Sequence, residues 1–300
     1  MWTHIASDVS DGHRLDLYER GGVFMIRADG WELMNGAYHA SEDQLGRLAG
    51  LLPRASEPAI LLGGLGLGYT LASLLKTLQG RFGAAPARVT VAERSGAVLR
   101  WYGDFVNPGL AATPPSGVRL VESDVVDWLG VGRGWDVIVL DVDNGPEALS
   151  APGNAVLYGE DGLARCRDSL APAGHLLLWA GFEDLGFVAR ACAVGFSVAR
   201  GYVTLPNRPD QAHLIYVLSR ERLPSAALGC TRGLDRCGAG RVGQAEVRRH
   251  RRRNRRLSPW TEHRCGWRGG VTPLCQAETN RRPHDPYAAP RIRHQQILIA

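Results

Sequence analysis

Short apolar runs alternate with helical patterns through most of this chain. After Gly68, for example, Leu71, Leu74, Leu75 and Leu78 are spaced as one face of a helix. The runs that read as buried strands are 59–62, 89–92, 118–121, 137–140 and 175–179, followed by two later strands around 196–202 and 213–218. Strands that alternate with helices in this way form a largely parallel sheet with helices on its faces. The pattern therefore predicts an α/β, Rossmann-like fold.

A different pattern precedes this alternation. Two pairs of turn residues, Gly21-Gly22 and Asp29-Gly30, separate short strand-like runs. Such pairs are typical of tight β-hairpins. We therefore predict a small N-terminal β-hairpin domain over residues 1–45, a Rossmann-like domain over 46–220, and a separate tail over 221–300.

Charge distinguishes the tail from the rest of the chain. Residues 1–220 hold 18 basic and 24 acidic residues, whereas residues 221–300 hold 17 arginines, no lysine and 6 acids. The tail also lacks a periodic apolar pattern, so we predict that it is disordered. An alternative is contact with nucleic acid, because exposed arginines bind phosphates. The spacing of the tail cysteines does not match the short pairs of zinc sites, and no metal site is predicted.

The apolar stretch at residues 60–75 reads "ILLGGLGLGYTLASLL" and carries no charge. It is shorter than the about 20 residues that a membrane helix requires, and it contains a glycine cluster. The N-terminus is charged and lacks the apolar run of a signal peptide. We therefore expect a cytoplasmic protein without a membrane partner.

The glycine cluster itself points to a ligand. Gly64, Gly66 and Gly68 lie between a predicted strand and a predicted helix. Glycines at this place let the backbone turn sharply and approach a ligand, while the start of the helix offers free N–H groups. The same arrangement fits NAD and other nucleotide ligands, so the loop alone does not identify the ligand.

Polar residues follow the predicted strands at their carboxyl ends, where open α/β sheets bind ligands. Glu93 ends the second strand and is placed to accept hydrogen bonds from ribose hydroxyls. Ser123 and Asp124 follow the third strand, and Asp124 could accept from an adenine amino group. Asp141 and Asp143 follow the fourth strand. Their joint placement predicts a binding site for an adenosyl ligand.

Six segments of the chain resemble a known family. They read "ILLGGLGLGYT", "VTVAERSGAVLRW", "VRLVESDVVDWL", "WDVIVLDVDNGPEAL", "NAVLYGEDGLARCRDSLAPAGHLLLW" and "HLIYVL". Together they are similar to the spermidine-synthase-like branch of the class I S-adenosylmethionine-dependent transferases, over about residues 12–218. The upstream stretch "HRLDLYERGGVFMIRADGWELMNGAYHASED" resembles the small N-terminal β domain of polyamine aminopropyltransferases.

The resemblance implies a transferase whose cofactor is S-adenosylmethionine or decarboxylated S-adenosylmethionine. It implies that the loop glycines lie beside the amino-acid or aminopropyl part, Glu93 on the ribose, and Ser123 with Asp124 near the adenine. Asp141 and Asp143 are the expected catalytic residues, and Asp141 also contacts the cofactor. The implied partners are a small-molecule acceptor, an amine, and a second copy of the chain in a homodimer. The loop residues in question are Gly63, Gly64, Gly66 and Gly68.

Two departures from the family pattern leave the reaction open. The family's glycine loop resembles "GGGDGG", whereas Gly66 stands here at the position of the acid. The family also resembles "DSSDP" or "DSTDP" after the fourth strand, and here Asp141 and Asp143 are one residue closer together. Fewer anions for a cationic substrate make methyl transfer an alternative to aminopropyl transfer. A further alternative is a non-catalytic adenosyl-ligand-binding protein whose basic tail contacts nucleic acid.

Overall fold

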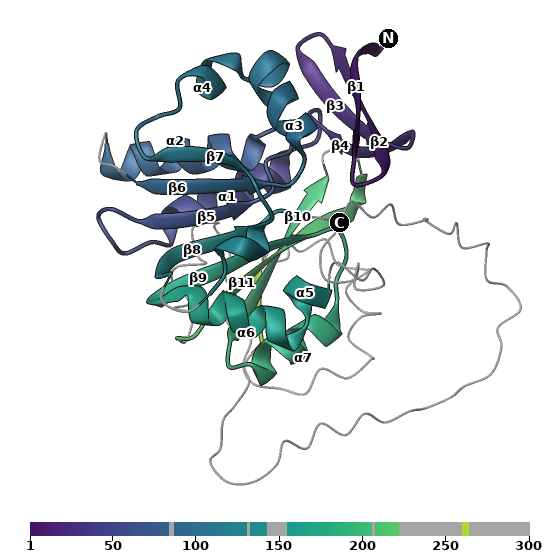
Figure 1. Cartoon of the computed structure of the whole chain (residues 1–300). Coiled ribbons are helices and arrows are strands. Elements are labelled where there is room, and N and C mark those ends of the chain that lie inside the picture. The colour runs from purple at the N-terminus through teal and green to yellow at the C-terminus, as the bar shows by residue number, and fades with distance from the viewer. Residues whose placement is uncertain (84–86, 131–132, 143–154, 206–207, 222–259, 264–300) are drawn as a thin grey trace, which may run out of the picture.

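The computed structural model of the chain describes residues 1–83, 87–130, 133–142, 155–205, 208–221 and 260–263. They form a four-stranded sheet near the N-terminus and an eight-stranded sheet with helices on its faces (Figure 1). The predicted α/β, Rossmann-like class with an N-terminal β unit is confirmed. The expected disorder of the tail and its nucleic-acid contacts concern residues that lie, apart from 260–263, outside the described part.

The N-terminal sheet is an antiparallel meander in the order β1-β2-β3-β4. Its strands are β1 (Thr3–Ser10), β2 (His13–Arg20), β3 (Val23–Ala28) and β4 (Trp31–Asn35). The predicted turns at Gly21-Gly22 and Asp29-Gly30 join consecutive strands, and all four residues have positive φ angles. A third turn of this kind, Asp11-Gly12, joins β1 to β2. The backbone conformation that these turns need is thus supplied by Gly and Asp residues.

The main sheet has the strand order β12-β10-β11-β9-β8-β5-β6-β7. The pairs β9–β8, β8–β5, β5–β6 and β6–β7 are parallel, whereas the pairs β12–β10, β10–β11 and β11–β9 are antiparallel. The strands are β5 (Ala59–Gly63), β6 (Arg88–Glu93), β7 (Val118–Glu122), β8 (Trp135–Leu140), β9 (Leu170–Ala180), β10 (Ser197–Leu205), β11 (Arg208–Ser219) and β12 (Trp260–His263). The chain runs outward from β5 in one direction and from β8 in the other. The crevice between β5 and β8 is therefore the topological switch point, where such sheets bind ligands.

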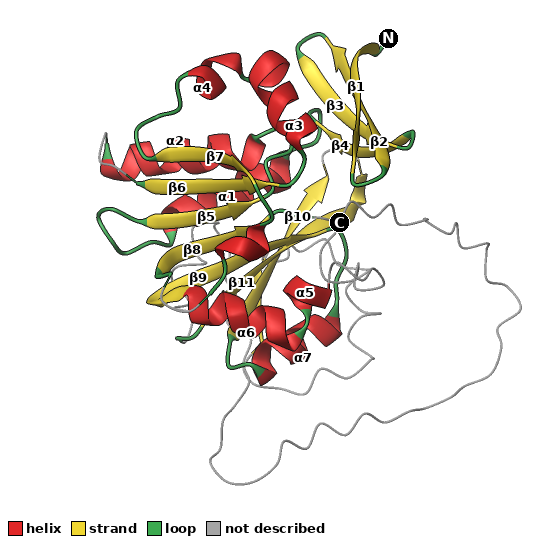
Figure 2. Ribbon diagram, viewed as in Figure 1, coloured by secondary structure: helices red, strands yellow, loops and turns green. Residues whose placement is uncertain are grey.

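Helices cover both faces of this sheet (Figure 2). Their bounds are α1 (Ala40–Leu51), α2 (Tyr69–Phe82), α3 (Gly96–Trp101), α4 (Pro108–Ala112), α5 (Ala155–Tyr158), α6 (Glu160–Ser169) and α7 (Leu185–Ala193). Successive strand residues alternate between the two layers, since Ile60 and Leu62 pack with α1 and α2 while Leu61 packs with α6 and α7. Burial on both faces explains why the strands read as unbroken apolar runs. Within the described residues, no helix combines the length and apolarity needed to cross a bilayer.

Three local predictions differ from the structure. Strand β9 begins at Leu170 rather than at His175, because an irregularity in its pairing with β8 absorbs the intervening residues. The helical pattern after Glu93 predicts Phe105 on one face with Val98, Trp101 and Tyr102. Helix α3 instead ends at Trp101 and continues as a π-helical turn, which leaves the Phe105 side chain exposed. Strand β12 lies in the tail, where no strand was predicted, and pairs with the outer edge of β10. An edge strand has free N–H and C=O groups for such pairing.

The N-terminal sheet packs against the glycine loop and α3. Leu15, Leu17 and Ile26 form one apolar cluster with Leu67 of the loop and Trp101 of α3. Two ion pairs at the periphery join the same units: Arg94 with Asp11 at 3.2 Å, and Arg100 with Asp8 at 2.5 Å. The N-terminal sheet is therefore fixed beside the carboxyl ends of the parallel strands. The predicted boundary between the two domains at residue 45 stays a prediction.

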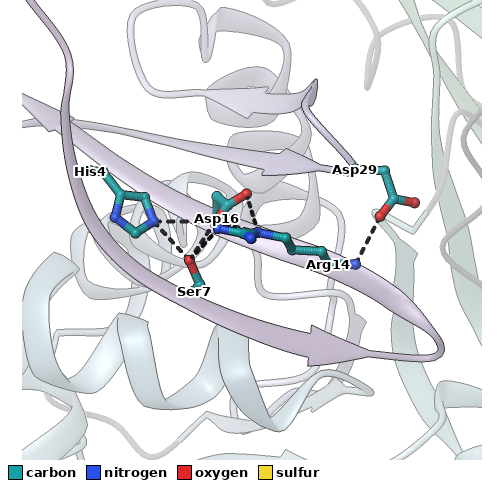
Figure 3. A network of polar contacts seen from close by, with 5 residues as sticks. All are labelled: His4, Ser7, Arg14, Asp16 and Asp29. Atoms are coloured by element: carbon teal, nitrogen blue, oxygen red, sulfur yellow. Dashed lines mark hydrogen bonds and ion pairs between the residues drawn. The ribbon is translucent and has the colours of Figure 1, made fainter.

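A polar network crosses the face of β1 and β2 (Figure 3). Arg14 donates to both carboxylate oxygens of Asp16, at 2.9 to 3.1 Å, and Ser7 donates to the same carboxylate at 2.5 Å. The Nε2 atom of His4 lies 3.2 Å from Asp16. Hydrogen bonds from Arg14 above all, and then from Ser7 and His4, lower the pKa of Asp16 to about 2 although the residue is only 6% exposed. Asp16 on β2 is thus ionised, and its hydrogen bonds to Ser7 and His4 link β2 to β1.

We expect Asp16→Asn to lower the free energy of unfolding by roughly 1.5–3 kcal/mol at pH 7, the range for hydrogen bonds to a charged group. A lowered pKa in the folded state stabilises the protein above the unfolded-state pKa, so this contribution disappears as the pH falls through about 2. Denaturant unfolding of both proteins at several pH values measures it. Asp104→Asn, at an exposed acid, is the control. An unchanged unfolding midpoint at pH 7 would contradict the expectation.

Candidate functional site

The glycine loop is held at the switch point by the backbones of both neighbouring strands. Gly64 N–H donates to the Ala92 carbonyl of β6 at 2.9 Å, and Asp141 N–H donates to the Gly63 carbonyl at 2.9 Å. Gly64 has a φ of +86°, and a Cβ atom there would lie 2.2 Å from the Asp141 carbonyl oxygen. Because the nearest atoms belong to the backbone of Asp141, they cannot move aside as the end of a flexible side chain could. A residue with a side chain at position 64 would therefore push the loop away from β8.

Gly66 faces the N-terminal sheet. A Cβ atom at this position would lie 2.7 Å from the sulfur of Met34 on β4. Gly66 also has a φ of +52°, which side chains rarely adopt. The thioether of Met34 thus occupies the space into which the acid of a "GGGDGG" loop would extend. The positive φ is the stronger reason for glycine at position 66, because the end of the Met34 side chain is flexible.

The Glu93 side chain fixes the loop from the side of β6. One carboxylate oxygen accepts from Leu65 N–H at 2.8 Å, and the other accepts from Ser95 N–H at 2.9 Å. The same hydrogen bonds hold the start of α3, where the Ser95 hydroxyl caps the helix by accepting from Val98 N–H at 3.3 Å. Each carboxylate oxygen keeps a second lone pair for a ligand hydroxyl. Glu93 therefore holds the glycine loop and the start of α3 in place, in addition to its predicted role in binding the ribose.

Ser123 and Asp124 lie at the end of β7, next to Glu93. Ser123 N–H donates to the Glu93 carbonyl at 3.0 Å, and the Ser123 hydroxyl accepts from the Trp128 indole at 3.0 Å. Asp124 caps the 3₁₀ turn Val125–Trp128 by accepting from Val126 N–H at 2.9 Å. Its other oxygen lies 3.6 Å from Arg94. Asp124 therefore has the capping role that is typical of loop acids. Its predicted contact with the adenine stays a prediction.

Asp141 is placed at the centre of the crevice by the end of β8. Its carboxylate accepts a hydrogen bond of 2.6 Å from the Thr70 hydroxyl, in the first turn of α2. Burial above all, together with the neighbouring acids Glu42 and Glu93, raises the pKa of Asp141 to about 7, although the Thr70 hydrogen bond opposes the shift. A carboxyl group with this pKa exchanges protons near neutral pH. It therefore has the acidity that a general base requires.

A pocket opens in front of Asp141 between the two sheets. The loop residues 65–68 line one side, and the remaining lining residues are Met34, Asn35, Glu42, Tyr69, Thr70 and Asp141. Of the residues predicted from the sequence, the pocket gathers Gly66, Gly68 and Asp141. Glu93, Ser123 and Asp124 lie along the adjoining strand ends and are not part of its lining. The predicted residue Asp143 lies outside the described residues.

Sequence reasoning missed several residues of this pocket. Tyr69 and Thr70 follow Gly68 directly, so their place at the start of the helix was a usable signal. Tyr69 stacks on His39 with ring centres 3.9 Å apart, and its hydroxyl donates to the Gly36 carbonyl at 3.3 Å. Glu42 and Met34 carried no such signal, because they reach the pocket from α1 and β4. Burial raises the pKa of Glu42 as well.

Comparisons with known proteins bear on this arrangement. No family model and no curated protein sequence matches the chain. Among solved structures, spermidine synthase from Thermotoga maritima superposes with a TM-score of 0.59 at 18% identity, over 75% of this chain and 74% of that one. A spermidine synthase in complex with the transition state analogue AdoDATO gives the same values. A probable spermidine synthase from Corynebacterium glutamicum has a TM-score of 0.51 at 14% identity, over 76% and 83% of the two chains.

These matches show that the chain has a spermidine-synthase-like fold of the class I S-adenosylmethionine-dependent type. At 14 to 18% identity the likeness concerns the fold. The resemblance expected from the sequence is confirmed at this level.

We expect Glu93→Ala to destabilise the ligand-free protein by about 1–3 kcal/mol, because it leaves the Leu65 and Ser95 N–H groups without their acceptor. It should also weaken adenosyl-ligand binding. Glu122→Ala is the matched control, since Glu122 is the register neighbour of Glu93 on β7 and its side chain is exposed. Denaturant unfolding without ligand gives the stability change. Equal stability of the two variants would show that Glu93 does not hold the loop.

Proposed function

We propose that this protein is a transferase that binds decarboxylated S-adenosylmethionine, or S-adenosylmethionine itself, and transfers an aminopropyl or methyl group to an amine. The observation that carries the proposal is the Asp141 carboxyl group, with a pKa of about 7, facing a pocket beside the glycine loop. The likeness to spermidine synthases supports it through the fold. The amine acceptor and a homodimer are predictions of the proposal.

The chemistry requires little from the protein beyond alignment and proton removal. The amine nitrogen attacks a carbon bonded to the sulfonium, the new C–N bond forms, and the C–S electrons return to sulfur, which leaves as a thioether. The attacking nitrogen then loses a proton, which the Asp141 carboxylate accepts. Thr70 orients that carboxylate through its hydrogen bond, and Tyr69 forms part of the wall beside it. Alignment of this kind accounts for much of the rate in bimolecular displacements.

The charge of the pocket favours the decarboxylated cofactor. Glu42 and Asp141 both line the pocket, and its described lining includes no lysine, arginine or histidine. The carboxylate of S-adenosylmethionine would lie near two acids without a cationic partner, whereas the ammonium of an aminopropyl group would be attracted. Glu42 also supplies an anion that the loop lacks at Gly66. Aminopropyl transfer is therefore the favoured reaction of the two.

Calorimetric titration of the full chain tests the cofactor assignment. We expect decarboxylated S-adenosylmethionine to bind more tightly than S-adenosylmethionine, and NAD not to bind. Glu42→Gln should reduce the preference for the decarboxylated form, because it removes one of the two acids. Binding of NAD alone would overturn the proposal. Binding of an adenosyl sulfonium without turnover of any amine would instead indicate a non-catalytic binding protein.

We expect Asp141→Asn to lower the single-turnover rate by about 100- to 10,000-fold, the usual contribution of a general base, with little change in cofactor affinity. In the wild-type protein the rate should rise with pH through about 7, as Asp141 loses its proton, and this rise should be absent from the variant. Asp127→Asn, an exposed acid near the site, is the control. Wild-type turnover of Asp141→Asn would exclude the residue as the base.

The raised pKa of Asp141 also predicts an effect on stability. A carboxyl group that holds its proton more tightly in the folded state loses its stabilising contribution as pH rises from the ordinary value of 3.8 through about 7. Asp141→Asn removes that loss. Its free energy of unfolding, relative to wild type, should therefore be higher at pH 8 than at pH 4. A pH-independent difference in denaturant unfolding would show that Asp141 ionises normally.

A further inference from the structure

A buried serine connects the pocket to a histidine on the opposite side of α1. Ser41 is 1% exposed, and its hydroxyl oxygen lies 2.5 Å from a carboxylate oxygen of Glu42. The same oxygen lies 2.8 Å from Nδ1 of His213 on β11. The three side chains therefore form a continuous hydrogen-bonded chain, in which both outer members can gain or lose a proton. The reaction steps described above do not use this chain.

Because the Ser41 hydroxyl group has a single hydrogen, the protonation state of Glu42 is coupled to that of His213. A serine hydroxyl has one hydrogen and can donate to only one of its two neighbours at a time. When Glu42 is ionised, Ser41 donates to it and accepts from a hydrogen on Nδ1 of His213. When Glu42 is protonated and donates to Ser41, the serine hydrogen turns to a bare Nδ1. The protonation state of Glu42 thus determines which ring nitrogen of His213 carries the hydrogen.

The two ends of the chain lie in different environments. Glu42 lines the pocket with Asp141 and contributes to the raised pKa of Asp141. His213 is half-buried, and its ring stands edge-on to Trp179 with ring centres 4.7 Å apart. Among the residues that the structure describes, no hydrogen bond to Nε2 of His213 is present. The chain therefore runs from the pocket to a partly exposed imidazole ring.

We propose that Glu42, Ser41 and His213 form a proton-exit relay for the pocket. The inference rests on the proposed function, since transfer to an amine releases one proton. The proton that Asp141 accepts from the amine is transferred across the pocket to the Glu42 carboxylate. Glu42 then passes a proton to the Ser41 oxygen while the Ser41 hydrogen passes to the bare Nδ1 of His213, whose ring carries its own hydrogen on Nε2. The resulting imidazolium releases its Nε2 proton to water, so that one proton enters and one leaves. Ser41 and His213 do not line the pocket, so they act on the reaction only through Glu42.

Other charged groups near the relay come from the same region. His39, which precedes α1, and Asp43 flank Glu42, and Nδ1 of His39 lies 2.8 Å from a carboxylate oxygen of Asp43. Asp141 faces Glu42 across the pocket, and the Tyr69 hydroxyl group lies on α2 near the same two acids of α1. Burial lowers the pKa of His213, which favours the neutral ring and makes the imidazolium release its proton readily. A neutral ring with one bare nitrogen is the form that a relay needs.

The tautomer of His213 tests the connection without any activity measurement. ¹⁵N NMR of the imidazole rings distinguishes a hydrogen on Nδ1 from one on Nε2. At pH 9 we expect the wild-type ring to carry its hydrogen on Nδ1, fixed by Ser41, and Ser41→Ala to lose this preference. The same tautomer in both proteins would overturn the relay. Amide spectra of Ser41→Ala verify that the variant is folded.

A second NMR measurement tests whether Glu42, at the pocket end of the hydrogen-bonded chain, affects the pKa of His213. Glu42→Gln removes the negative charge at the far end of the chain, so the pKa of His213 should fall below its wild-type value. Asp43→Asn removes a neighbouring charge that is paired with His39 and is the matched control. An equal or larger shift in Asp43→Asn would show that the effect is general electrostatics and would overturn the hydrogen-bonded coupling.

The role in turnover has its own test. His213→Gln should slow steady-state turnover, in which the pocket must lose one proton per cycle, by less than the about 100-fold minimum expected for loss of a base, and most strongly at low pH, where proton release is hardest. The single-turnover rate should stay near the wild-type value, because Asp141 accepts the proton in that step. Cofactor affinity should be unchanged. His175→Gln, at another buried histidine on β9, is the control. Wild-type pH–rate behaviour of His213→Gln overturns the role in turnover. If wild type itself transfers no group, the proposed function fails, and the tautomer result still decides the relay.

Discussion

The close approach of two backbones at the switch point, Gly64 against the carbonyl of Asp141, determines the rest of the site. No side chain separates the end of β5 from the end of β8, so the loop and the Asp141 carboxyl group lie in one crevice. The Glu93 carboxylate then holds the loop from β6, and α2 starts directly beneath Asp141. Each of these contacts depends on the parallel strands ending at the same edge of the sheet.

The second constraint is apolar and comes from the N-terminal sheet. Leu67 joins the cluster of β2, β3 and α3, which fixes the meander over the loop. Met34 then fills the space in front of Gly66, and Glu42 follows on α1. The pocket therefore exists only where the two sheets meet. Its anions come from β8 and α1 rather than from the loop, which explains how the chain can dispense with an acid at position 66.

Electrostatics in this pocket follows from the same geometry. Two carboxyl groups share a poorly hydrated space without a basic residue in the described lining, so both pKa values rise. Such a pair repels anions and stabilises a cationic ligand. Hydrogen bonds through Ser41 connect Glu42 of this pair to His213. The raised pKa values and this hydrogen-bonded connection are thus consequences of one placement of acids.

The sequence by itself determined the sheet, the glycine loop and the strand-end acids. Each of these has a local cause: Ile60 to Leu62 are apolar because both faces are covered, and Glu93 and Asp141 follow their strands directly. Only the tertiary structure decided that Met34 and Glu42 line the pocket and that His213 is hydrogen-bonded to Ser41 beside it. They come from an N-terminal strand, a helix and a late strand, and no periodicity or spacing relates them. Packing of distant elements sets their distances, and a local pattern cannot encode it.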